Sequence, residues 1–226
     1  MLTACAGTQI ERAPQPPSWA SLGEKNILAW TPEEQRLGYP NIRYINPTRE
    51  LKPSETPWPL PHALWTDPAP WEQVMHEMKL AGLIIVHNGN IKFEGYADGH
   101  APTTRWMSFS VTKSVVSMLY GLAIAEGKIK SLDETVADHL PSFDGTGYAK
   151  VRLRDLLQMA SGVAWNEDYR DPNSDVARLD NASESEVLIH LASLPAIHDP
   201  GSVFNYNTGE TTLAGAILSR AVGMSL

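Results

Sequence analysis

The chain has 226 residues, of which 42% are hydrophobic and 19% charged, a composition typical of one substantial soluble domain with or without a tail. Its formal charge of −8, with no basic run longer than two residues, argues against a nucleic-acid partner, because phosphate binding requires clustered Lys and Arg. The only cysteine, Cys5, excludes an internal disulfide, and no stretch reaches the roughly 18 apolar residues of a membrane span.

The extreme N-terminus resembles a bacterial lipobox, the short sequence around a lipoprotein cleavage site. The match is Leu2-Thr3-Ala4-Cys5, without the basic and apolar segments that normally come before it. We therefore expect the true start to lie upstream, with Cys5 as the lipidated first residue of a tail over residues 1–20. This implies the bacterial cell envelope or periplasm and a membrane tether through Cys5. The alternative is a chance tetrapeptide at an ordinary cytoplasmic start.

Residues 21–226 are predicted to be the folded portion. Thr31 is expected to cap a helix whose first turn holds a proline and a glutamate that completes a capping box. Residues 38–70 are rich in proline and predict an extended segment without long elements. A second helix is expected to begin at Asp67 and to run through Met78.

The clearest hairpin follows. Residues 83–86 and 91–96 have the composition of two strands, and residues 87–90 between them contain Asn88-Gly89, the pair that a tight turn favours. The main helix is then expected from near Ser110 through Ile124, with Gly127 ending it. The remaining predicted elements are a capping box at Ser131–Glu134, a short helix at 151–159, a polar acidic loop at 163–181, a helix capped by Ser183, a turn at Pro200-Gly201 and a helix at 210–222.

Ser110 and Lys113 form a Ser-x-x-Lys motif in the first turn of the main helix. Residues three apart lie on one helix face, so the amine can reach the hydroxyl and remove its proton. Burial and the helix dipole both favour the neutral amine that this step needs, and the Ser110 amide could donate to an oxyanion. About one such motif is expected by chance in a chain of this size. The apolar residues 106–109 before it, however, predict that the motif is partly buried and not on a solvated face.

Residues 105–114 resemble the nucleophile segment of the serine β-lactamase-related, penicillin-binding-protein-like family. Four further stretches agree in order with that family: the hairpin, residues 127–141, residues 151–162 and residues 200–206. The resemblance covers roughly residues 25 to 226. It implies an α/β (α+β) fold of the β-lactamase/transpeptidase type, in which an antiparallel sheet lies beside an all-helical lobe.

Within that family the likeness is greatest to 6-aminohexanoate-oligomer hydrolases and related esterases, and residues 165–176 carry it. In such enzymes this acidic, aromatic loop borders the substrate cleft, which makes Tyr169 and Trp165 candidate substrate contacts. The alternative is a solvated loop with a few helix caps.

Tyr206 falls where the family places the tyrosine of a Tyr-x-Asn motif. A phenol can pass a proton between the serine and the leaving group if a lysine stabilises its charged form. The third position holds Thr208 in place of asparagine, and Asn207 stands one residue early. The geometry is therefore adjusted, or Thr208 replaces that polar contact with the substrate; the alternative for Tyr206 is a core tyrosine.

The family's third motif, a Lys-Thr-Gly-like strand that completes the cleft, has no match before Leu226. The later strands of the family's sheet are also missing, and a lone hairpin is marginally stable. We therefore expect the chain to be truncated at its C-terminus, with the activity of this portion alone uncertain.

The resulting prediction is a serine hydrolase that cleaves an ester or amide of a small molecule through an acyl-enzyme on Ser110, with Lys113 and Tyr206 moving the proton. No cofactor and no metal are implied. A DD-peptidase or true β-lactamase is one alternative, and a non-catalytic penicillin-binding-like module is another. The substrate and the oligomeric state are not determined by these residues.

Overall fold

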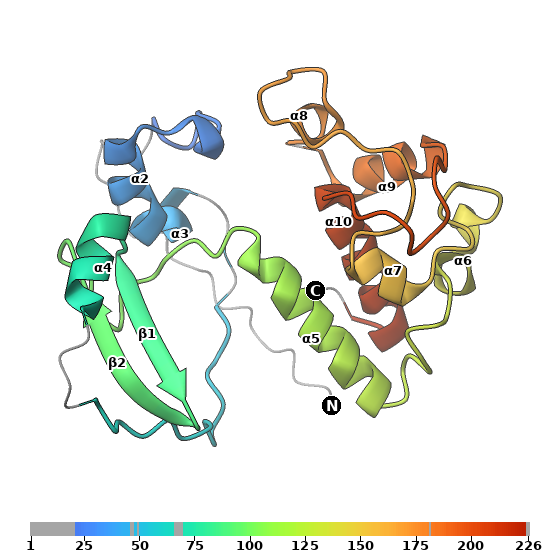
Figure 1. Cartoon of the computed structure of the whole chain (residues 1–226). Coiled ribbons are helices and arrows are strands. Elements are labelled where there is room, and N and C mark those ends of the chain that lie inside the picture. Colours follow the sequence, from blue (N-terminus) through green and yellow to red (C-terminus); the bar gives the residue numbers. More distant parts are fainter. Residues whose placement is uncertain (1–20, 46–47, 49, 66–69, 181, 225–226) are drawn as a thin grey trace, which may run out of the picture. The chain divides into compact units, whose positions relative to one another are not determined.

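A computed structural model describes residues 21–45, 48, 50–65, 70–180 and 182–224 (Figure 1). The chain divides into two compact units, residues 1–107 and residues 108–226, which are described separately. The predicted tail over residues 1–20, with Cys5, lies outside the described residues. The prediction of one hydrolase domain over residues 21–226 is not tested by this division and stays a prediction.

The first unit begins with short helices: η1 (Ile27–Ala29), α2 (Pro32–Gly38), η2 (Tyr39–Asn41) and α3 (Ile42–Ile45). The predicted capping box of α2 is confirmed, because the Thr31 hydroxyl accepts from the Glu34 amide and the Glu34 carboxylate accepts from the Thr31 amide. Trp30 packs under this helix with 4% of its surface exposed. Its ring stacks on Tyr39, with the ring centroids 5.7 Å apart.

A hairpin and one helix form the rest of this unit. Strands β1 (Gly82–His87) and β2 (Asn90–Tyr96) pair antiparallel, with an irregularity between Ile85 and Val86. The predicted turn is confirmed: Asn88 and Gly89 have φ of 51° and 71°, the left-handed values that a two-residue hairpin turn requires. Helix α4 (Trp71–Met78) lies against the hairpin, where its first residue contacts Phe93. The predicted helix start at Asp67 lies outside the described residues.

The predicted extended segment contributes to the sheet. Ile91 in β2 donates its amide to the Pro61 carbonyl and accepts from the Ala63 amide, both at 2.9 Å, and Trp65 donates to the Lys92 carbonyl at 3.1 Å. These bonds occupy part of the edge of β2. A hairpin alone would leave all the backbone N–H and C=O groups at this edge of β2 free to pair with another chain. The bonds to the extended segment reduce the number of these free groups.

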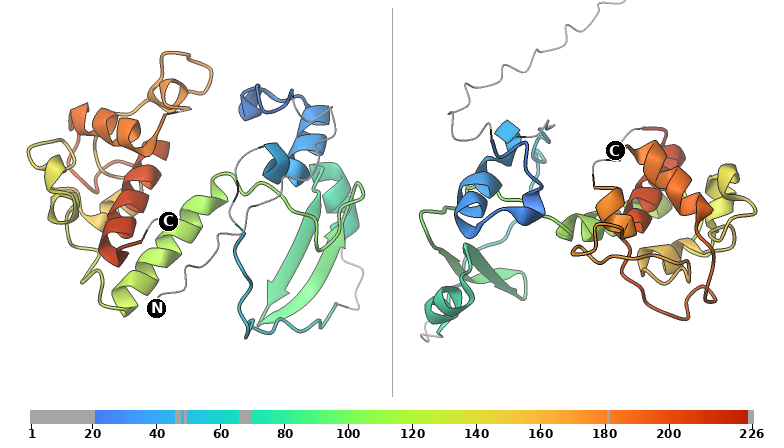
Figure 2. Two further views of the ribbon diagram at one scale, coloured as in Figure 1. Left: turned by 180° about the vertical axis from the view of Figure 1, so that it is seen from behind. Right: turned by 90° about the horizontal axis from the view of Figure 1, so that it is seen from above.

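The second unit is all-helical over its described residues. Its elements are α5 (Val111–Ala125), α6 (Val136–His139), η3 (Pro141–Phe143), α7 (Leu153–Leu157), α8 (Asp175–Arg178), α9 (Glu184–Ser193) and α10 (Thr208–Val222). Helix α10 packs against α5, α6, α7 and α9, and Figure 2 shows α10 beside α5 from two further directions. Leu213 and Ile217, both fully buried, form the centre of the core with residues of these neighbours.

Most helix ends of this unit follow the predicted signals. Gly127 has φ of 69° two residues after α5 ends at Ala125, and the Ser183–Glu186 capping box opens α9. Helix α10 begins two residues earlier than predicted, because the Asn207 side chain caps it. The predicted loop at 163–181 contains the short helix α8, which Ser174 caps.

The predicted capping box at Ser131 is wrong. The Ser131 hydroxyl accepts from the Asp133 amide two residues on, which forms a turn and not a helix start. The helix begins four residues later, where Thr135 and Asp138 form the capping box of α6. The Glu134 carboxylate instead accepts from the Lys130 amide.

Candidate active site

The Ser-x-x-Lys motif is assembled in one turn at the start of α5. Ser110 immediately precedes the helix, and Lys113 Nζ donates to Ser110 Oγ at 3.2 Å. This is the predicted arrangement of two side chains on one helix face. The Ser110 amide stands at the helix start, where N–H groups have no intrahelical acceptor and point toward an incoming anion.

The prediction that the motif is partly buried is wrong for the serine. Ser110 is exposed and Lys113 is half-buried. The reason is that α5 packs through one face only: Tyr120 and Ala123 are buried, whereas Val111 is 67% exposed. Apolar neighbours in sequence therefore do not cover Ser110.

Phe109, directly before the serine, has φ of 44°. This left-handed conformation is costly for a bulky side chain and is typical of residues that hold a functional neighbour in place. Around it the chain turns into the helix, because the Val111 amide donates to the Ser108 carbonyl at 3.0 Å and the Thr112 amide donates to Phe109 at 3.1 Å. The turn presents Ser110 at the helix end.

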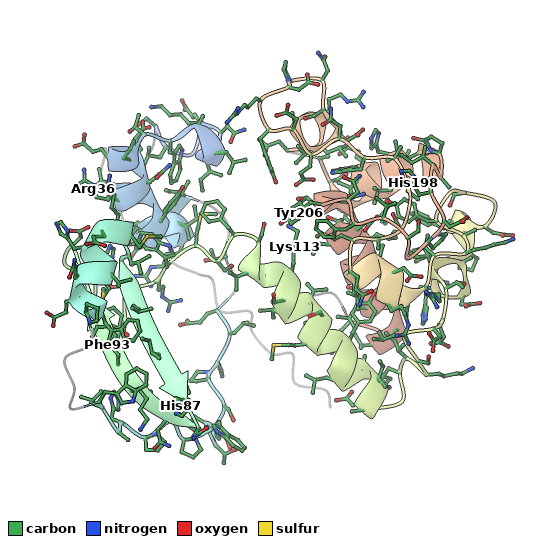
Figure 3. All side chains as sticks on the ribbon, viewed as in Figure 1. Arg36, His87, Phe93, Lys113, His198 and Tyr206 are labelled. Atoms are coloured by element: carbon green, nitrogen blue, oxygen red, sulfur yellow. The ribbon has the colours of Figure 1, made fainter. Side chains whose placement is uncertain are left out.

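Tyr206 lies next to the lysine. Lys113 Nζ is 5.2 Å from the centroid of the Tyr206 ring, a cation–π distance, and Figure 3 shows the two side chains next to each other, from α5 and from the residues before α10. Tyr206 is half-buried, so it is not a fully enclosed core tyrosine. The fold thus brings together Ser110, Lys113 and Tyr206, the three residues predicted to be catalytic.

The residues after Tyr206 have different tasks from those in a Tyr-x-Asn motif. Asn207 is buried and caps α10: its side chain accepts from the Glu210 amide at 3.1 Å and donates to the Tyr148 hydroxyl at 3.2 Å. Thr208 is half-buried, and its amide donates to Glu167 at 3.0 Å. Asn207 is therefore the N-cap of α10. The residue at the third position of the motif is Thr208, which is bonded to Glu167.

Glu167 organises the predicted substrate-binding residues, although it is not itself among the residues predicted to bind substrate. Its carboxylate accepts from the Trp165 indole, from the Tyr169 hydroxyl at 2.6 Å and from both the amide and the hydroxyl of Thr208. Burial and the hydrogen bond to Glu167 raise the pKa of Tyr169. The acidic loop is thereby fastened to the start of α10, with Tyr169 53% exposed beside it. A glutamate between a tryptophan and a tyrosine, each two residues away, was the signal available in the sequence.

A second glutamate lies beneath the site. Glu210 is 2% exposed, and burial raises its pKa to about 7, against the opposing effect of the Ser161 and Tyr148 hydroxyls. The Tyr148 hydroxyl donates to this carboxyl at 3.2 Å, and its own pKa is raised by burial and by the Glu210 charge.

Other parts of the described chain offer less chemistry. A hollow of about 1110 Å³ in the first unit is lined by Tyr39, His100 and Trp106 among others, and it contains none of the predicted site residues. Within the described residues, no cluster of His, Cys, Asp or Glu could hold a metal ion. None of the helices described there is both long and apolar enough to cross a membrane.

Comparison with known proteins gives consistent matches. The beta-lactamase family model matches residues 71–226, more than half of the chain. A curated relative, the 6-aminohexanoate-dimer hydrolase of Paenarthrobacter ureafaciens, is 24% identical over 220 residues, which are 91% of this chain and 56% of the relative.

Solved structures agree on the fold. A Bacillus anthracis protein provisionally named a 6-aminohexanoate-dimer hydrolase superposes with a TM-score of 0.73 at 21% identity, over 94% of this chain and 60% of the other. A class C beta-lactamase of Rhodobacter sphaeroides gives a TM-score of 0.50 at 23% identity, over 69% and 43% of the two chains. The chain therefore spans less than two thirds of the length of these proteins. The predicted α+β fold of the β-lactamase/transpeptidase type is confirmed, and the chain belongs to the beta-lactamase family of hydrolases.

Proposed function

We propose that the whole protein is a serine hydrolase that cleaves an ester or amide bond through an acyl-enzyme on Ser110. The observation that carries the proposal is the 3.2 Å contact from Lys113 Nζ to Ser110 Oγ in the first turn of α5. A hydroxyl in hydrogen-bond contact with an amine base is the arrangement that nucleophilic catalysis requires.

The reaction follows from the placement of three side chains. Ser110 Oγ attacks the substrate carbonyl carbon while its proton moves to a neutral Lys113 amine. The carbonyl oxygen becomes an oxyanion, to which the Ser110 amide at the helix start donates. Tyr206 beside Lys113 passes the proton to the leaving alcohol or amine as the carbonyl–leaving-group bond breaks. Water then attacks the acyl-enzyme, and the released serine recovers its proton.

The substrate class that we propose is a short linear amide or ester, like that of the 6-aminohexanoate-dimer hydrolase relative. Support comes from the side chains that Glu167 holds in one cluster: Trp165, Tyr169 and Thr208. The exposed Tyr169 offers flat apolar surface, which suits an aliphatic chain, whereas Trp165 packs against the helical core behind it. DD-peptidase and β-lactamase activities are the alternatives within the same chemistry.

The first experiment is the intact mass of the chain after exposure to a fluorophosphonate probe. We expect an adduct that is lost in Ser110→Ala and kept in Ser114→Ala, a matched change of an exposed serine one turn later on α5. The same test on a longer form that spans the full length of the relatives separates a need for further segments from a lack of reactivity. No adduct on either folded form would refute the hydrolase and favour the non-catalytic binding module.

Substrate choice is tested on the longer form with p-nitrophenyl esters, 6-aminohexanoate dimer, a chromogenic cephalosporin and a D-alanyl-D-alanine peptide. We expect turnover of the first two. Faster turnover of the cephalosporin or the peptide would instead assign a β-lactamase or a DD-peptidase.

We also propose that the protein is tethered to the cell envelope through a lipid on Cys5. The lipobox-like residues 2–5 are the support. Expression from the natural start should place the protein in the membrane fraction, and Cys5→Ser should release it. Recovery of both forms in the cytoplasm would favour the chance tetrapeptide.

A further inference from the structure

Asp175, the first residue of α8, closes a loop of the helical unit. Its carboxylate Oδ2 accepts from the Asn166 amide at 2.7 Å, and the Val176 amide donates to the Asn166 carbonyl at 3.3 Å. These two bonds join the ends of residues 167–174, which form a compact loop whose two ends lie close together. Tyr169, one of the predicted substrate contacts, lies within this loop. The proposed mechanism gives Asp175 no task.

The same carboxylate ties the base of this loop to helix α9. Its Oδ1 atom lies 2.6 Å from His190 Nε2 and accepts from Arg178 Nη2 at 3.1 Å. Because a carboxylate only accepts, the His190 nitrogen carries the hydrogen of this bond. The side chains of Asp175 and His190 are 13% and 21% exposed, so water competes little for the pair. Burial acts to raise the pKa of Asp175, but the hydrogen bonds that it accepts outweigh burial and hold the pKa below its ordinary value. Asp175 is therefore an ionised anchor whose bonds are charge-assisted.

This anchor lies next to residues predicted to bind substrate. Trp165 directly precedes Asn166, and its ring meets the His190 ring edge-on, with the centroids 6.3 Å apart. The Trp165 indole donates to Glu167, whose carboxylate also accepts from the Tyr169 hydroxyl at 2.6 Å. A displacement of Asn166 would therefore move the residues on both sides of it, and with them the Tyr169 hydroxyl.

We propose that Asp175 and His190 are positioning residues, which together hold residues 165–174 in the conformation that binds substrate. The proposal rests on the proposed function for the role of this loop. The hydrogen bonds of the pair lead to the loop, to α8 and to α9, and not to Ser110. Loss of the pair should therefore weaken substrate binding and leave the attack by Ser110 intact.

The first test measures the loop in this chain by NMR, without turnover. Asp175→Ala removes the acceptor of the Asn166 amide, so hydrogen exchange at that amide should become at least about tenfold faster. The backbone amide signal of Tyr169 should also shift, because the loop loses its anchor. Asp144→Ala, a matched change at an exposed aspartate of the same unit, should alter neither signal. An unchanged Tyr169 signal in folded Asp175→Ala would overturn the proposal, because the loop would then keep its conformation without this carboxylate.

The second test separates positioning from folding and uses the longer form with its best substrate. His190→Gln keeps a nitrogen donor at about the position of Nε2, whereas His190→Leu removes the donor with little change of volume. We expect His190→Leu to raise KM about tenfold with kcat changed less than twofold, and His190→Gln to restore most of the loss. Equal KM values in the two variants, or a fall in kcat in place of a rise in KM, would refute the positioning role. Fluorophosphonate labelling separates the two proposals: a loop that moves in Asp175→Ala without labelling of any form refutes only the hydrolase, and labelling with a loop that does not move refutes only the role of the pair.

Discussion

The buried carboxyl of Glu210 should make the stability of this protein fall as the pH rises toward neutrality. Its pKa is raised from an ordinary value of 4.5 to about 7 by burial. Between these two pH values the folded state binds a proton that the unfolded state has lost. The free energy of unfolding therefore contains a contribution that is fully present below pH 4.5 and is lost as the pH rises through 7.

The magnitude follows from the size of the shift. A difference of about 2.5 pH units, at about 1.4 kcal/mol per unit, corresponds to about 3 kcal/mol between pH 4.5 and pH 8. Glu210→Gln cannot ionise and should lack this loss. Relative to the natural protein, the variant should therefore gain about 3 kcal/mol across that range. The gain would make it the more stable of the two at pH 8 if the amide keeps the hydrogen bond to Tyr148.

The assay is urea unfolding of both proteins at half-unit steps from pH 4.5 to 8, followed by tryptophan fluorescence and by far-UV circular dichroism. Groups with lowered pKa values, such as Asp138 and Glu186, act in the opposite direction but contribute equally to both proteins. The difference between the two curves isolates Glu210, and Glu184→Gln serves as the control. A difference that stays constant with pH would refute the reasoning, because it would mean that the carboxyl titrates alike in the folded and unfolded states.

Three further changes test the core, a turn and the candidate substrate loop. Leu213→Ala removes a fully buried side chain from the centre of the helical unit and should lower the free energy of unfolding by about 2–5 kcal/mol, measured by urea unfolding. Gly162→Ala should destabilise by at least about 1 kcal/mol, since φ is 76° and a Cβ would lie 2.2 Å from the His198 carbonyl oxygen; an unchanged urea midpoint would contradict this. Glu167→Gln weakens the charge-assisted bonds to Thr208 and its neighbours, so kcat/KM of the longer form for small amides should fall about tenfold, while fluorophosphonate labelling of the chain changes less than twofold.

The sequence alone predicts those structural features whose interacting residues lie close together in the chain. The hairpin turn depends on Asn88 and Gly89, the capping box of α2 on Thr31 and Glu34, and the contact from Lys113 to Ser110 on a spacing of three residues. In each case the residues that make the interaction lie within one turn of each other. The pattern of residue types is then sufficient to predict the geometry.

Features that depend on distant residues were missed or misjudged. Glu167 contacts Thr208 across 41 positions, and the Tyr148 hydroxyl reaches Glu210 across 62. The burial of Ser110 was misjudged for the same reason, because the residues that cover a side chain are chosen by tertiary packing and not by its neighbours in sequence. The capping box expected at Ser131 failed because a second capping sequence follows four residues later.

The two parts of the candidate active site are positioned by a core contact that carries no catalytic chemistry. Lys113 is on α5 and Tyr206 precedes α10, so their separation depends on how these two helices are placed along each other. Seven residues after Lys113, the buried hydroxyl of Tyr120 donates to the Ala214 carbonyl of α10 at 2.8 Å. This bond fixes the axial position of one helix against the other, since a slip by one turn would leave the buried hydroxyl of Tyr120 without this partner. The lysine that contacts Ser110 is thereby held against the ring of Tyr206, which lies just before α10.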